Sequence, residues 1–205
     1  MRYLDLKQKL SDQLIFTAND IKKIDSNFYL SRLTEWQKKG YIKKAIKGYY
    51  IFSDIKLDEI ALFAIANRIY SPSYISLESA LRYYNVIPEG VFSITSVSTR
   101  NSYEFSTSIA KFKYRKENPV LFFGYHIIQK DNYKVKIATL EKTLLDYFYL
   151  NSEFSAKQDI EELRFNLAML SENLDKEELI KQLNRFNNKR LKQIISILLK
   201  IIKNA

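Results

Sequence analysis

The chain of 205 residues has no cysteine, one histidine, four glycines and three prolines. Without cysteine there is no disulfide, no thiolate zinc site and no cysteine nucleophile. The one histidine, His126, stands in a strand-like segment, where an imidazole is usually structural, and no second imidazole exists to complete a metal site. The glycines are scattered and form no phosphate-binding loop. We therefore expect neither an enzyme nor a bound metal or cofactor.

Long apolar runs are also missing. The longest candidate, residues 194–202, is broken by Ser196 and Lys200, and it falls well short of the ~20 apolar residues that span a bilayer. The first residues lack the apolar core and the cleavage site of a signal peptide. These absences predict a cytoplasmic protein with no membrane partner.

Positive charge is abundant and gathers at both ends of the chain. The net charge is +10, and basic against acidic side chains number 11 to 6 in residues 1–54, 12 to 10 in residues 55–154 and 10 to 7 in residues 155–205. Such clusters are typical of a protein that binds a polyanion. A generally lysine-rich composition is the competing explanation. The 46% hydrophobic content, with 13 Phe and 15 Tyr, predicts a globular core rather than disorder.

Three short helices are predicted within the first 40 residues. Apolar residues at helical spacing predict a helix over residues 4–14. A second, short helix that contains Asp20 is predicted over residues 18–24. A turn at residues 25–27 then supplies an N-cap, after which Tyr29, Leu33 and Trp36 form a core-facing stripe. Gly40 is expected to end this third helix.

Two strand-like runs follow at once. Residues 41–52 are β-prone on both sides of Lys47 and Gly48, which predicts a hairpin with a tight turn. Three helices followed directly by a basic hairpin are the order of a winged helix-turn-helix, predicted here over residues 1–54. A generic three-helix bundle is the alternative.

On a helical wheel the side of the third helix opposite the apolar stripe is polar and basic. Such a face suits the major groove of DNA, where Asn, Arg and Ser reach base edges, while lysines of a wing contact phosphates. The predicted DNA-binding residues are Asn27, Ser31, Arg32, Thr34, Glu35, Lys38 and Lys39 from the helix and Lys43, Lys44 and Lys47 from the wing.

The remaining residues, 55–205, predict an α+β domain whose last part, from about residue 155, is helical. Predicted helices cover residues 57–70 and 76–84, and predicted strands cover residues 92–99, 103–107, 110–115, 124–128 and 134–137. Ser76 is interpreted as a helix cap. Thr139 caps the next helix, with apolar residues on one face and Lys142 and Asp146 as an i,i+4 pair. Breaks near Asn173 and at residues 187–188 divide the tail.

Several segments together resemble the AbiEi antitoxin family over roughly residues 10–150. The segments that carry the resemblance are residues 29–33 (Tyr-Leu-Ser-Arg-Leu), 38–42 (Lys-Lys-Gly-Tyr-Ile), 47–50 (Lys-Gly-Tyr-Tyr), 74–81 (Tyr-Ile-Ser-Leu-Glu-Ser-Ala-Leu), 87–89 (Ile-Pro-Glu) and 138–146 (Ala-Thr-Leu-Glu-Lys-Thr-Leu-Leu-Asp). Leu140 departs from the pattern, because the family has proline after Ala-Thr.

The resemblance implies an antitoxin of a type IV toxin-antitoxin system, linked to abortive phage infection. It implies that the N-terminal winged helix binds double-stranded DNA at the protein's own promoter as an autorepressor, and that the second domain carries antitoxin activity. The implied partner is a nucleotidyltransferase-like toxin of the AbiEii type. Repressors commonly read paired half-sites, so a homodimer on DNA is also expected.

Two other functions are compatible with the same sequence. The chain could be a stand-alone transcriptional regulator whose second domain senses a ligand or dimerises. It could also be a protein-interaction module that uses its basic ends to hold an acidic partner and never touches DNA.

Overall fold

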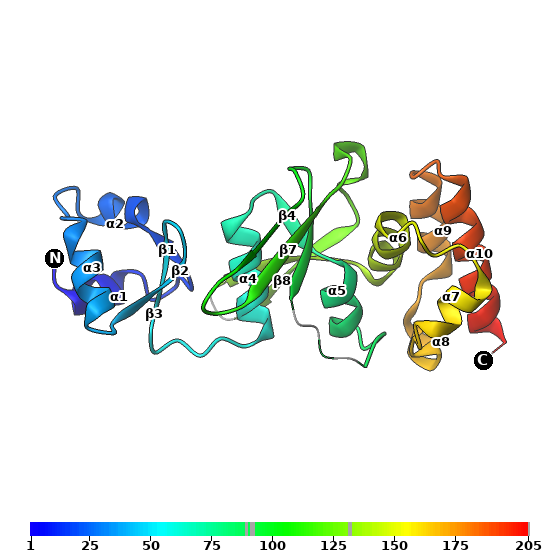
Figure 1. Cartoon of the computed structure of the whole chain (residues 1–205), viewed down its shortest axis with the longest axis horizontal. Helices are drawn as coiled ribbons and strands as arrows, with labels where there is room; N and C mark the ends of the chain where they lie inside the picture. Colours follow the sequence, from blue (N-terminus) through cyan, green and yellow to red (C-terminus); the bar gives the residue numbers. More distant parts are fainter. Residues whose placement is uncertain (89, 91–92, 131–132, 205) are drawn as a thin grey trace.

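The computed structural model describes residues 1–88, 90, 93–130 and 133–204. The chain runs from one end of an elongated molecule to the other in three successive parts: an N-terminal part, a central sheet with its helices, and a group of C-terminal helices (Figure 1). The mixed α+β fold predicted from the sequence is confirmed. None of the described helices is long and apolar enough to cross a membrane.

The N-terminal part holds three helices and a three-stranded antiparallel sheet in the strand order β1-β3-β2. The elements in chain order are α1 (Tyr3–Lys9), β1 (Phe16–Thr17), α2 (Ala18–Ile24), α3 (Ser31–Lys38), β2 (Ile42–Ile46) and β3 (Tyr49–Phe52). Phe16 pairs with Tyr50, and Ile42 pairs with Phe52, so β3 lies between the other two strands.

Two local signals explain where α2 begins and where α1 ends. Thr17 and Asp20 form a capping box, in which the Thr17 hydroxyl accepts from the Asp20 N–H and the Asp20 carboxylate accepts from the Thr17 N–H. The helix predicted over residues 4–14 is too long, because α1 ends at Lys9. Ser11 and Asp12 follow, and such side chains compete with the helix by bonding to nearby backbone.

The sheet of the N-terminal part has apolar side chains on both faces. One face packs on α1, α2 and α3 in a cluster that includes Phe16, Trp36 and Phe52. The other face contributes Ala45 and Ile51 to the core of the central part. The N-terminal part is therefore in apolar contact with the central part through its sheet.

The central part is a six-stranded mixed sheet in the order β6-β7-β5-β4-β9-β8. Its strands are β4 (Ser73–Ile75), β5 (Ile94–Ser98), β6 (Tyr103–Ser106), β7 (Lys111–Lys116), β8 (Tyr125–Lys130) and β9 (Tyr133–Ala138), and its helices are α4 (Glu59–Ile69), α5 (Leu77–Tyr83), the 3-10 turn η1 (Pro119–Leu121) and α6 (Leu140–Leu150). The pairs β4–β9 and β5–β7 are parallel, and the other neighbours are antiparallel.

The two faces of this sheet bury different helices. Ile75, Phe112 and Ile137 pack with α4, whereas Tyr74 and Val97 pack with α6 and the C-terminal helices. Tyr74 and Ile75 are neighbours in β4, and successive strand residues point to opposite faces. This central strand was not predicted from the sequence, because it is three residues long and directly follows a proline.

The C-terminal part consists of four helices that cover α6. They are α7 (Lys157–Glu162), α8 (Leu167–Asn173), α9 (Lys176–Asn184) and α10 (Lys189–Lys203). The predicted breaks near Asn173 and at residues 187–188 are confirmed, and a further break at residues 163–166 was not predicted. The Asn188 side chain accepts from the Leu191 N–H and so caps α10. Arg190 then donates to the carbonyl oxygens of Phe148, Tyr149 and Phe154, which fixes the start of α10 to the end of α6.

Two predicted positions, Phe92 at the start of a strand and Glu89 in the 87–89 segment, lie outside the described residues.

Candidate nucleic-acid interface

Helix α3 is held by its C-terminal end and by one buried side. Gly40 adopts a φ of +70°, its N–H donates to the Gln37 carbonyl at 3.0 Å, and the Tyr41 N–H donates to the Trp36 carbonyl at 2.9 Å. This pair of bonds is a Schellman motif, which needs a left-handed residue that glycine adopts without strain. The predicted end of the helix is confirmed.

The buried side of α3 differs from the predicted stripe. Leu33 and Trp36 are buried, but Tyr29 is 76% exposed, so its predicted core position is wrong. Phe28 is buried instead, with its ring 5.4 Å from that of Trp36. The helix begins only at Ser31, so Tyr29 lies in the turn before it, where helical spacing does not apply.

The predicted N-cap of this helix is also wrong. Asn27 lies in the turn after α2, where its N–H donates to the Asp25 carboxylate at 3.1 Å, and the residue at the N-cap position of α3 is Leu30. Asn27 is exposed but does not belong to the helix. The structure therefore separates it from the other predicted helix residues.

Four predicted residues share one exposed face of α3. Ser31, Thr34, Glu35 and Lys38 are all exposed and recur at intervals of three or four residues. Lys39, also exposed, donates to Glu35 at 2.7 Å, and this hydrogen bond lowers the pKa of Glu35 and raises that of Lys39. The face thus offers hydroxyl groups, a carboxylate that stays ionised and an ammonium, which are all groups that can bond to base edges.

Arg32 belongs to the flank of α3 rather than to this face. Its guanidinium donates to the Met1 carbonyl at 2.8 Å and lies 5.5 Å from the centre of the Trp36 ring. The N-terminal ammonium pairs in turn with Asp25 at 3.3 Å. Arg32 is therefore already used to hold the start of the chain against α3.

The basic hairpin follows α3 as predicted, with its turn at Lys47 and Gly48, and Gly48 has a φ of +84°. Lys43, Lys44 and Lys47 are all exposed. Lys43 pairs with Ile51, which packs toward the central part, whereas Lys44 pairs with Tyr50, which packs on the helices. Because paired residues share a face and neighbours alternate, the two lysines leave β2 on opposite sides.

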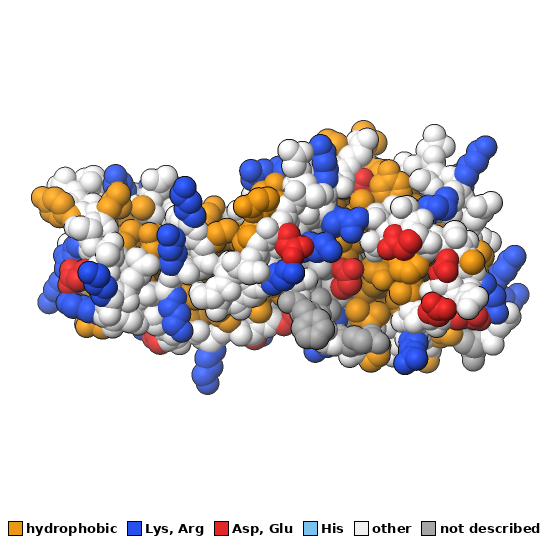
Figure 2. Space-filling view, viewed as in Figure 1, with side chains coloured by type: hydrophobic (Ala, Val, Ile, Leu, Met, Phe, Trp, Pro, Cys, Tyr) orange, Lys and Arg blue, Asp and Glu red, His pale blue; other side chains and the backbone are white. Residues whose placement is uncertain are grey.

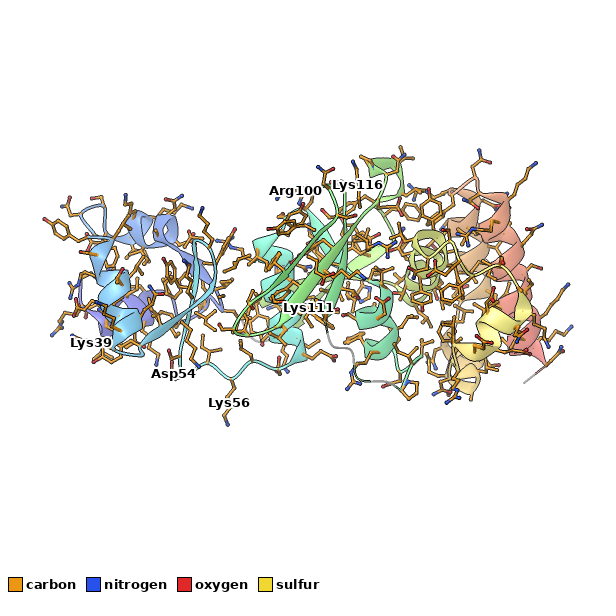
Figure 3. The ribbon with its side chains drawn as sticks, in the orientation of Figure 1. Lys39, Asp54, Lys56, Arg100, Lys111 and Lys116 are labelled. Atoms are coloured by element: carbon orange, nitrogen blue, oxygen red, sulfur yellow. The ribbon has the colours of Figure 1, made fainter. Side chains whose placement is uncertain are left out.

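The hairpin also touches the central part. The Ser108 hydroxyl donates to the Lys44 carbonyl at 3.4 Å from the loop between β6 and β7. In Figure 3, Lys111 at the start of β7 lies toward the N-terminal part, and Lys39 lies on the outer edge of that part. The basic side chains of the N-terminal part are scattered over its surface in Figure 2 and flank a few acidic ones.

The exposed apolar groups beside α3 were not predicted from the sequence. Tyr29 and Leu30 are 76% and 47% exposed and stand directly before the helix. The signal was present in residues 28–30 (Phe-Tyr-Leu), three large apolar residues in a turn that can bury only one of them. Exposed apolar side chains next to a polar helix face suit contact with a thymine methyl group.

A second cluster, in the central part, is polar but completely buried. Tyr74 and Ser76 each donate to one oxygen of Asp146 at 2.9 Å, and Lys142 pairs with the other oxygen. Ser76 is the N-cap residue of α5, as predicted, but its hydroxyl donates to Asp146 and makes no capping hydrogen bond. The predicted i,i+4 pair of Lys142 and Asp146 is confirmed.

The environment of this cluster is apolar. Lys142 lies 4.7 Å and 4.6 Å from the ring centres of Phe123 and Phe186. Burial raises the pKa of Asp146, and the Lys142 charge opposes this rise. The Lys142, Asp146 and Ser76 side chains have no exposed surface, and the cluster joins β4 to α6.

The other candidates for catalysis or metal binding are His126 and the acidic side chains. His126 is exposed on β8, an edge strand, opposite Ile137 of β9. Within the described part of the chain, no three His, Cys, Asp or Glu side chains are close enough to hold a metal ion. The exposed face of α3 with the adjoining hairpin is therefore the candidate site.

A comparison of the chain with models of known protein families finds no family that matches it, and a comparison with curated proteins finds no match.

Proposed function

We propose that the N-terminal part is a winged helix-turn-helix that binds double-stranded DNA. The order α1-β1-α2-α3-β2-β3, with a three-stranded antiparallel sheet, supports this assignment. In it α3 is the recognition helix and the β2–β3 hairpin is the wing. The observation that carries the proposal is the face of Ser31, Thr34, Glu35 and Lys38, exposed along a helix whose other side is fixed by Leu33 and Trp36.

The proposed roles of the residues differ by chemistry. Ser31, Thr34 and Glu35 read base edges from the N-terminal half of α3 and its middle, and Lys38 and Lys39 contact phosphates at its C-terminal end. In the wing, Lys44 and Lys47 add phosphate contacts, and Lys43 does so from the opposite face of β2. Arg32 supports the helix rather than contacting DNA, because its guanidinium is bonded to the Met1 carbonyl.

We further propose that the chain is an antitoxin of the AbiEi type that represses its own promoter and opposes a nucleotidyltransferase-like toxin. The resemblance over residues 10–150 supports this. Two of its segments, residues 74–81 and 138–146, supply the buried Tyr74, Ser76, Lys142 and Asp146. In this proposal these four buried residues stabilise the fold of the antitoxin domain and do not carry its chemistry.

A toxin-rescue assay tests the antitoxin function separately from DNA binding. The neighbouring gene is expressed from an inducible promoter in cells with the full-length wild-type chain, a Ser31→Ala/Thr34→Ala variant or an empty vector. We expect growth arrest with the empty vector and rescue by both chains, with repression of the native promoter by the wild type alone. A neighbouring gene without toxicity, or no rescue by the wild type, would refute the antitoxin function and leave DNA binding untouched.

A further inference from the structure

A pocket of about 500 Å³ lies where the N-terminal part meets the central sheet. Its wall is formed by the segment before β1, by one side of α4 and by the ends of β4, β8 and β9. The pocket does not include any residue of the proposed DNA-binding face.

The pocket opens because two parallel strands separate. β4 pairs with β9 only where Ile75 lies opposite Ile137, and the preceding residues of the two strands are not paired with each other. Asn67 of α4 bridges the gap, since its side-chain oxygen accepts from the Lys136 N–H at 2.7 Å. That bond fixes which end of the Asn67 amide faces the backbone and leaves the NH2 group on the other side.

Two buried polar groups at this gap have no hydrogen-bond partner among the described residues. They are the Asn67 side-chain nitrogen and the hydroxyl of Ser73, a residue only 2% exposed, and both residues line the pocket. Buried polar atoms without partners are rare in native proteins, because each costs the free energy of its lost hydration. A ligand with acceptor atoms would satisfy both.

The charges and the walls indicate what kind of ligand fits. Arg68, Lys134 and Lys136 line the pocket with one acidic residue, Asp12, and Arg68 also pairs with Asp20 at 3.3 Å. The lining is net positive even when the charge of Arg68 is balanced by Asp20. Its apolar wall includes Leu14, Ile15, Ala64 and Ile127. Donors and cations near an apolar wall suit a small molecule with an anionic head and an apolar body.

We propose that this pocket binds a small amphiphilic anion. Its carboxylate or phosphate head accepts from Asn67 and Ser73 beside Arg68, and its apolar body lies along Leu14 and Ile15. Because Leu14 and Ile15 lead directly into β1, the ligand links the N-terminal part to the central sheet. An effect of the bound ligand on DNA affinity rests on the proposed function, but the binding of the ligand to the pocket does not.

The test is a titration of the ¹⁵N-labelled full-length chain, followed by NMR, with three probes that share one apolar tail: hexanoate, hexyl phosphate and hexanol. We expect saturable shifts of the Asn67 side-chain amide and of the Ser73 and Ile15 backbone amides with hexanoate or hexyl phosphate, and the tighter of the two identifies the head group. Hexanol should bind at least about tenfold more weakly, because it lacks the charge that strengthens the hydrogen bonds.

Ser73→Ala is the diagnostic variant. It removes an unpartnered hydroxyl, so the fold should be kept, and binding should weaken about three- to tenfold. Ser96→Ala is the matched control, since the Ser96 hydroxyl is equally buried and without a partner among the described residues, but it lies on β5 outside the pocket. Absence of saturable shifts, equal binding of hexanol, or equal weakening by both variants would overturn the inference.

Repeating a promoter-binding titration with saturating hexanoate or hexyl phosphate then separates the two proposals. If the anion binds and the chain does not bind DNA, the proposed function fails and the pocket stands. If DNA binds and no anion does, the pocket inference fails alone.

Discussion

Lys142 and Asp146 lie one turn apart on α6 and form an ion pair whose two side chains are completely buried. Asp146 also accepts from the hydroxyl groups of Tyr74 and Ser76, which brings β4 and the start of α5 against α6. A buried charge is expensive when its partner is lost, because the remaining ion is left without water. This pair therefore makes the packing of the central part specific.

Replacing Asp146 by Asn should be strongly destabilising, because it leaves the Lys142 ammonium buried without its counter-charge. We expect a loss of about 3–5 kcal/mol in the free energy of unfolding, measured by urea denaturation. The control is Glu161→Gln, which breaks the exposed i,i+4 pair of Lys157 and Glu161 on α7 and should cost less than about 0.5 kcal/mol. Similar losses in the two variants would contradict this account.

Glu117 should make stability depend on pH. Burial raises its pKa to about 7, the Asn118 N–H that donates to its carboxyl at 2.6 Å opposes this rise, and Asp146 adds to it. Between its ordinary pKa of 4.5 and about 7, the unfolded chain releases a proton that the folded chain retains. Stability from this group is therefore present below the lower pKa and falls as the pH rises through that window.

The Glu117→Gln variant measures this contribution, since its side chain does not titrate. We expect the free energy of unfolding of the wild type, relative to the variant, to fall by on the order of 2–3 kcal/mol between about pH 4.5 and about pH 7.5. Parallel pH profiles of the two proteins would show that Glu117 titrates normally in the fold.

Gly124 is a position where an added side chain would be both strained and crowded. Its φ is +69°, and an added Cβ would lie 3.0 Å from side-chain carbons of Lys142 and from the Gln182 oxygen. Gly124→Ala should therefore cost about 2–4 kcal/mol, from backbone strain and from displacement of the buried lysine. Gly48→Ala is the control, because it shares the positive φ but has open space, and should cost about 1 kcal/mol. Equal losses would mean that the contact with Lys142 is easily relieved.

The proposed division between phosphate and base contacts predicts different effects of two kinds of variant. Lys47→Ala should reduce the slope of log affinity against log salt concentration by about 0.9, with little change in sequence preference. Thr34→Ala should leave the slope unchanged and reduce the preference for the promoter over a scrambled duplex. Arg100→Ala, at a residue of the central part whose guanidinium lies 4.2 Å from the Tyr70 ring centre, is the control (Figure 3). Equal changes in slope for Lys47→Ala and Thr34→Ala would refute the assigned roles.

Local signals predicted the starts and ends of several elements. Thr139 caps α6 and Gly40 ends α3, as predicted, because these residues satisfy backbone groups within their own few positions. Thr17 with Asp20 caps α2 and Asn188 caps α10 by the same kind of local bond, although only a break at residues 187–188 was predicted from the sequence there. The turn at Gly48 is predictable for the same reason, since it needs a positive φ.

Tertiary features were not predictable from the same patterns. A helical wheel assumes that the helix has already begun, so it placed Tyr29 in the core, although α3 starts two residues later. The i,i+4 spacing predicted the pair of Lys142 and Asp146 but not its burial, because Tyr74 and Ser76, which donate to Asp146, lie about 70 residues away in the chain. The pocket beside Asn67 and Ser73 depends on the separation of β4 from β9, a strand pair that no local pattern reveals.

The most direct test of the central claim is a fluorescence-anisotropy titration of the full-length chain with its own upstream promoter fragment and with a scrambled duplex of equal length, at two salt concentrations. We predict binding that is tighter on the promoter and that weakens steeply with salt, with the promoter preference reduced in Ser31→Ala/Thr34→Ala. If the chain binds neither duplex at the lower salt concentration, the exposed face of α3 is not a DNA-binding surface.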